Sequence, residues 1–143
     1  MTAATDTAPA PTVPAPAPIG AARLAIATAV AVALNLAVFL IGDLAGATWA
    51  IGEPYPVGVV MVVAATAVPM ALAGVVVWFA ARRRPALQRV AAWVGLAVAL
   101  VTVPRAFMAA VDGTTAVSLA LMHVVAGAAW VLALRPGAGG TRA

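Results

Sequence analysis

The chain has 143 residues, of which 65% are hydrophobic and 8% charged, and its net charge is +4. Soluble domains are typically about 45–50% apolar and about 25% charged, so this composition excludes an ordinary soluble domain and indicates an integral membrane protein. Cysteine is absent from the sequence, which excludes disulfides, thiolate nucleophiles and cysteine-ligated metals.

Residues 1–20 are rich in Ala, Pro and Thr. Proline fixes φ and removes a backbone donor, so we expect this segment to be a disordered cytoplasmic tail. It is not expected to be a cleaved signal, because no apolar core directly follows a charged start. Residues 136–143 are Gly-rich and are expected to form a flexible C-terminal tail.

Four long apolar runs follow the N-terminal tail, and about 20 apolar helical residues suffice to cross a membrane core of ~30 Å. We therefore predict an all-α fold, a four-helix transmembrane bundle over residues 21–135 with short up-down connections. Thr114 or Thr115 is expected to cap the last helix. The expected spans are residues 21–41, 57–81, 87–107 and 116–134.

Arginines set the predicted orientation. In a four-span chain both termini and the central loop share one side, and every arginine except Arg105 falls there. Because positive charge accumulates on the cytoplasmic side, the bias predicts N-in/C-in. We expect these arginines to contact lipid head groups, and we expect no nucleic-acid partner. The topology-determining loop carries Arg82, Arg83, Arg84 and Arg89.

The origin of the chain is suggested by its composition. All eight basic residues are arginine, and the chain is rich in Ala, Val, Gly and Pro, as is typical of GC-rich bacterial genomes. Together with the orientation, this predicts a multi-pass protein of a bacterial inner membrane with both termini cytoplasmic.

Few polar side chains lie within the spans. Asn35, Thr66 and His123 fall at similar predicted depths, and unsatisfied polar groups are costly in hydrocarbon. We expect them to face the bundle interior, with Asn35 hydrogen-bonded to His123 directly, through a water or through Thr66. Since no carboxylate lies within a span, a hydrogen-bonded neutral His123 is favoured over proton relay, catalysis or ligand contact. We assign no catalytic residue, cofactor or metal ligand.

A second group of polar residues is predicted at the outer rim: Asp43, Arg105 and Asp112. These residues predict either a wet salt bridge from Arg105 to one of the acids or a polar vestibule that opens outward.

Three segments of the sequence resemble those of a known protein family. They are Ala33-Leu34-Asn35-Leu36, Ala81-Arg82-Arg83-Arg84-Pro85, and Leu119-Ala120-Leu121-Met122-His123-Val124-Val125-Ala126 with Trp130. Over residues 21–135 the chain resembles a family of small four-span membrane proteins, common in actinobacteria and known only as a domain of unknown function. The resemblance implies the four-span fold and implies no activity, cofactor or catalytic residue.

Function remains open between three hypotheses. The first is a non-enzymatic accessory or structural protein that binds a partner or lipid, and it rests on the lack of any catalytic constellation. The second is a small transporter or channel, which would require a homo-oligomer to form a pore. The third is a lipid-modifying enzyme that uses His123.

Overall fold

The computed structural model describes residues 20–52 and 55–135. It contains four helices, and the described residues include no strand: α1 (Ala21–Leu44), α2 (Val59–Arg83), α3 (Ala86–Ala109) and α4 (Gly113–Leu134). All four are long and apolar enough to cross a membrane. The prediction of an all-α four-helix bundle is confirmed. The expectations for the two tails lie outside the described residues, apart from Gly20.

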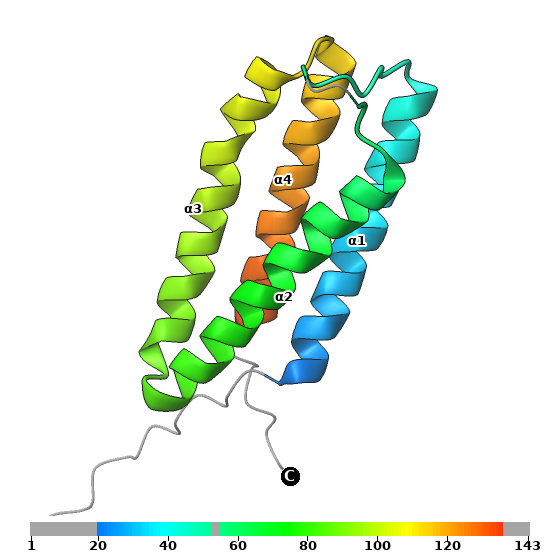
Figure 1. The fold of residues 1–143 in the computed structure, drawn as a ribbon. Helices are drawn as coiled ribbons and strands as arrows, with labels where there is room; N and C mark the ends of the chain where they lie inside the picture. The colour runs from blue at the N-terminus through cyan, green and yellow to red at the C-terminus, as the bar shows by residue number, and fades with distance from the viewer. Residues whose placement is uncertain (1–19, 53–54, 136–143) are drawn as a thin grey trace, which may run out of the picture.

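The helices run alternately up and down (Figure 1). α4 packs against both α3 and α1, α1 packs against α2, and the contact between α2 and α3 is the smallest of these four between neighbouring helices. Figure 1 shows α2 and α3 diverging from their shared turn, with α4 visible between them. The bundle is therefore a ring of helices that is weakly closed on its α2–α3 side.

The two ends of the bundle differ in chemistry. One end, called here the arginine end, holds the α2–α3 turn and the described termini. The opposite end, called here the loop end, holds residues 45–52, 55–58 and 110–112. The arginines of the arginine end are Arg23, Arg82, Arg83, Arg84, Arg89 and Arg135.

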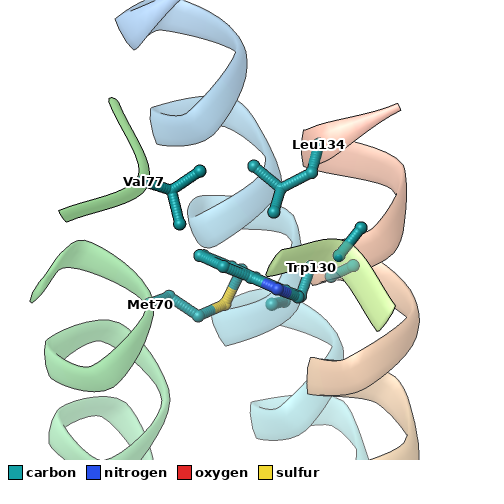
Figure 2. Close-up of a cluster of buried hydrophobic side chains, with 7 residues drawn as sticks. Met70, Val77, Trp130 and Leu134 are labelled. Atoms are coloured by element: carbon teal, nitrogen blue, oxygen red, sulfur yellow. The ribbon is translucent and has the colours of Figure 1, made fainter. Parts of the chain in front are cut away.

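A hydrophobic cluster fills the half of the bundle nearer the arginine end. Met70 and Val77 of α2 meet Trp130 and Leu134 of α4 there (Figure 2). Trp130 donates from Nε1 to the Ala91 carbonyl oxygen of α3, 2.9 Å away. The cluster also includes Ala31 of α1 and Ala92 of α3, so it ties all four helices together without leaving the indole nitrogen unsatisfied.

Small residues allow the close α3–α4 packing. A Cβ on Gly95 would overlap the Trp130 indole, and a Cβ on Gly127 would lie 2.8 Å from the Ala99 Cβ. Because apolar surface gives little drive for helices to associate in lipid, such close approach is the main source of packing energy. At these two positions small residues therefore serve packing within one chain.

Both neighbours of α4 satisfy the carbonyl groups at its C-terminal end. Arg23 of α1 donates to the Arg135 carbonyl oxygen and, over 2.8 Å, to that of Leu132. Gln88 of α3, which is buried, donates to the Leu134 carbonyl oxygen at 2.8 Å. The last carbonyls of a helix have no partner within the helix, so these side chains replace water there.

The N-terminal end of α4 corrects one expectation. The capping residue is Asp112, rather than Thr114 or Thr115, and its Oδ1 accepts from the Thr115 backbone N–H at 2.8 Å. The helix consequently begins at Gly113, earlier than the predicted boundary at residue 116. Aspartate is a strong N-cap because its carboxylate also faces the positive end of the helix dipole.

Candidate functional site

A cavity of about 290 Å³ lies in the half of the bundle nearer the loop end, where α2 and α3 diverge. Its wall is mostly apolar, and exposed residues of α2 and α3 lie at its edge, so it opens between these two helices. Ligand sites in proteins are commonly apolar hollows of this kind, of about 300–1,000 Å³, with a few placed polar groups. The polar side chains on its wall are Asn35, Thr66, Thr102, Arg105 and His123.

The long loop between α1 and α2 forms part of the cavity wall at the loop end, through Ile51 and Val57. Trp49 holds this loop in place. It adopts φ +59, is 4% exposed and stacks on Phe39 with ring centroids 4.3 Å apart. Its backbone N–H donates to Thr115 Oγ1 at 3.0 Å, and its carbonyl accepts from the Val57 N–H at 2.8 Å. A left-handed conformation is unfavourable for tryptophan, so these contacts together impose it.

Asn35 of α1 and Thr66 of α2 form a buried polar contact on the cavity wall. Asn35 Nδ2 donates to Thr66 Oγ1 at 2.9 Å, and the Thr66 hydroxyl donates to the Val62 carbonyl oxygen at 2.8 Å. Asn35 is 2% exposed, and its Oδ1 has no hydrogen-bond partner among the described residues. A buried acceptor without a donor is costly, so this oxygen is the least satisfied group on the wall.

His123 lies on the same wall, and the structure forms neither the direct hydrogen bond to Asn35 nor the link through Thr66, whose hydroxyl donates to Val62 instead. Its Nδ1 lies 2.7 Å from the Leu119 carbonyl oxygen of its own helix. A carbonyl oxygen only accepts, so Nδ1 carries a hydrogen and donates it to Leu119. The ring bonds locally because a residue four positions earlier is always within reach in a helix.

Pro69 leaves an acceptor of α2 without its usual helical donor near the edge of the cavity. Proline has no N–H, so the carbonyl oxygen of Ala65, four residues earlier, lacks its usual helical donor. Ala65 lines the cavity. The hydroxyl of Thr102, also on the wall, donates to the Ala99 carbonyl oxygen at 2.7 Å. The donors of Asn35, Thr66 and Thr102 on this wall are therefore engaged within the protein, and the Arg105 guanidinium supplies further donors.

The rim residues separate into different environments. Arg105 is exposed and belongs to the cavity wall, and in the described part of the chain no salt bridge joins it to Asp43 or Asp112. Asp43 is exposed near the end of α1. Asp112 accepts from the Thr48 hydroxyl and backbone N–H, and also from the Thr115 hydroxyl and backbone N–H. These donors, led by the Thr48 hydroxyl, hold the pKa of Asp112 well below its usual range.

The arginines of the turn lie away from the cavity. Arg82, Arg83, Arg84 and Arg89 are exposed at the arginine end, and the Arg82 guanidinium lies 3.7 Å from the Trp78 ring centroid. An arginine stacked on an aromatic ring at the end of a span is typical of a membrane interface.

Sequence reasoning pointed to Asn35, Thr66 and His123, and the structure places all three on one cavity wall. It missed the cavity, because hydropathy does not show which two helices diverge. It also missed the hydrogen bond from Gln88 to the C-terminal end of α4. A glutamine in the first turn of a helix, with arginines on both sides, is only a weak signal for such a bond. The Ala65 carbonyl was detectable in principle, since Pro69 is visible in the sequence.

Comparison with protein families identifies the chain. A family model described as "Family of unknown function (DUF6069)" matches residues 15–139. The chain belongs to this family. No curated protein and no solved structure matches it. Family membership agrees with a small four-span membrane protein and attaches no activity to the cavity.

Proposed function

We propose that this DUF6069 protein is a non-enzymatic accessory protein that binds one lipid molecule in the cavity between α2 and α3. The cavity's opening between two weakly touching membrane helices carries the proposal, because a ligand entering there comes from the bilayer. The volume admits a polar group and the adjoining part of a chain, while the rest of the lipid remains among the membrane lipids.

The orientation of the site belongs to the same proposal. The arginine bias supports N-in/C-in in a bacterial inner membrane, so the loop end would face outward. The cavity then lies in the outer half of the bilayer. Arg105, the charged side chain on the wall, sits toward the loop end, at a depth suited to a lipid head group or glycerol oxygens.

Two observations favour lipid binding over the alternatives. The cluster of Met70, Val77, Trp130 and Leu134 fills the half of the bundle beyond the cavity, so a single chain offers no continuous channel within its described residues. Among the residues that the structure describes, no carboxylate lies on the cavity wall to act with His123 as an acid–base pair.

Native mass spectrometry of the full chain, released from membranes in mild detergent, tests the proposal. Ala65→Trp places a large ring at the cavity edge on an exposed position of α2, and Ala71→Trp is its control on the same helix, exposed and away from the cavity. We expect wild type and Ala71→Trp to retain about one lipid per chain and Ala65→Trp to lose it. Equal lipid content in all three proteins would refute the proposal.

A further inference from the structure

Arg105 of α3 is the charged side chain of the cavity wall among the residues that the structure describes. It is exposed, and within the described part of the chain no salt bridge or hydrogen bond occupies its guanidinium. A guanidinium presents five N–H donors in a planar fork that matches the oxygens of a phosphate. An anion at this wall would therefore meet donors for which the described protein offers no competing acceptor.

The donors of the other polar side chains on the wall are engaged. Asn35 Nδ2 donates to Thr66 Oγ1, and the hydroxyls of Thr66 and Thr102 donate to backbone carbonyl oxygens of their own helices. Nδ1 of His123 is held in the same way, 2.7 Å from a carbonyl oxygen of α4. Polar recognition is therefore concentrated at Arg105, and the rest of the wall, which is mostly apolar, suits a hydrocarbon chain.

The depth of Arg105 matches the head-group region of a bilayer. α3 has 24 residues and is thus about 36 Å long, which exceeds the ~30 Å of the hydrocarbon core. Arg105 lies one turn before Ala109, the last residue of α3, so its long side chain reaches the interface. His123, ten residues after the start of α4 at Gly113, lies about 15 Å in from the loop end. The cavity therefore carries its charge near the interface and continues inward as an apolar hollow, which is the polarity of a phospholipid.

The balance of charge favours an anionic head group over a zwitterionic one. The described wall carries the positive charge of Arg105 and no carboxylate. Asp112, at the same end of the bundle, already accepts hydrogen bonds from Thr48 and Thr115. The ammonium of a zwitterionic head group would find no described acid on this wall, whereas Arg105 alone complements a single negative charge.

We propose that the ligand of this cavity is an anionic phospholipid whose phosphate accepts hydrogen bonds from the Arg105 guanidinium while an acyl chain lies against the apolar wall. This inference rests on the proposed lipid-binding function and specifies the head group that is recognised. Phosphatidylglycerol has the required chemistry, because its phosphodiester carries one negative charge and its head group carries no cation. The remaining chain extends through the α2–α3 opening into the bilayer.

The test uses three lipids that share their acyl chains and differ only in the head group. Dioleoylphosphatidylglycerol has an anionic phosphodiester, dioleoylphosphatidylethanolamine adds an ammonium, and dioleoylglycerol has no phosphate. Each is titrated onto the delipidated full chain in an uncharged detergent, and native mass spectrometry measures the bound fraction. We expect wild type to bind phosphatidylglycerol about tenfold more tightly than dioleoylglycerol, which corresponds to about 1.4 kcal/mol. It should also bind phosphatidylglycerol about threefold more tightly than phosphatidylethanolamine.

Two matched variants assign the preference to one arginine. Arg105→Gln removes the charge at an exposed position on the cavity wall, and Arg89→Gln makes the same change at an exposed position of the same helix at the arginine end. We expect Arg105→Gln to bind phosphatidylglycerol about tenfold more weakly and dioleoylglycerol as wild type does, which also shows that the variant is folded. Arg89→Gln should keep the wild-type preference. Ala65→Trp should lose all three lipids, because contact with head groups outside the cavity would not require the hollow.

The outcomes separate this inference from the function on which it rests. Equal binding of phosphatidylglycerol and dioleoylglycerol by wild type, abolished for both by Ala65→Trp, overturns the anionic head group and leaves lipid binding intact. Equal binding of phosphatidylglycerol and phosphatidylethanolamine overturns the anionic head group as well. So does a preference that survives in Arg105→Gln or that falls equally in Arg89→Gln. Failure of every probe to bind, together with equal lipid retention by Ala65→Trp and wild type, overturns both proposals.

Discussion

Trp130 of α4 donates from its indole Nε1 to the Ala91 backbone carbonyl oxygen of α3, and the absence of a side chain at Gly95 makes room for that ring. The two features depend on each other, since a Cβ at Gly95 would overlap the indole where it reaches the carbonyl. The α3–α4 contact thus combines close packing with one specific hydrogen bond.

Gly95→Ala is expected to destabilise the bundle despite alanine's higher helix propensity. Overpacking of a close contact typically costs about 1–3 kcal/mol, which exceeds the gain of about 1 kcal/mol from replacing a helical glycine. The melting temperature in detergent measures the effect. Gly113→Ala is the control, because a Cβ there meets nothing within 4 Å, and it should be neutral or stabilising. Equal melting temperatures for the two variants would contradict the packing account.

Asn35→Leu and Thr66→Val are expected to show energetic coupling, since Asn35 Nδ2 donates to Thr66 Oγ1 at 2.9 Å. Interhelical hydrogen bonds in membranes average about 0.6 kcal/mol and reach about 1.7 kcal/mol, so the coupling should fall in that range. A double-mutant cycle on unfolding free energies measures it. Thr102→Val serves as the control partner, because the Thr102 hydroxyl bonds within its own helix, and it should combine additively with Asn35→Leu. Equal coupling in both cycles would show that the measured term is not this bond.

Asp112 is expected to make the stability of the protein sensitive to acid. Hydrogen bonds from Thr48 and Thr115 lower its folded-state pKa, so its contribution is fully present above the unfolded pKa of about 3.9. That contribution is lost as pH falls through the lower folded value. Melting temperatures from pH 7 to pH 3 should stay level in wild type and then fall, and the fall should be shallower in Asp112→Asn. Asp43→Asn, at an exposed acid, should keep the wild-type profile, and identical profiles for both variants would argue against this linkage.

The proposed orientation predicts the behaviour of reporter fusions. A reporter active only outside the cytoplasm should be active when joined after Gly46 or Asp112, and silent after Arg84 or at Ala143. The reason is that Gly46 and Asp112 lie at the loop end, and Arg84 lies at the arginine end. Whole-cell reporter activity normalised to expression gives the measurement. Activity at Ala143 would overturn the N-in/C-in arrangement.

The number and type of helices could be predicted from sequence because four apolar runs of membrane length leave no other fold available. The boundaries of α4 could not, because its first residues, Gly113 and Thr115, are polar or small and the decisive cap is the carboxylate of Asp112. Depth along the spans placed Asn35, Thr66 and His123 at one level, yet depth alone does not give helix rotation or spacing. The partner of Asn35 and the opening of the cavity depend on those two quantities.

The hydrogen bonds at the two ends of α4 have a consequence for the order of assembly during synthesis. Its C-terminal carbonyls bond to Arg23 and Gln88, and its N-terminal cap bonds to Thr48. All three partners are made earlier than the helix they hold, and α3 makes its most extensive contacts with α4. A nascent chain that ends before α4 therefore lacks the helix that packs against both α1 and α3. α4 is made after the other three spans and completes their contacts, so chains cut short before residue 113 should be recognised by membrane quality control as unassembled helices.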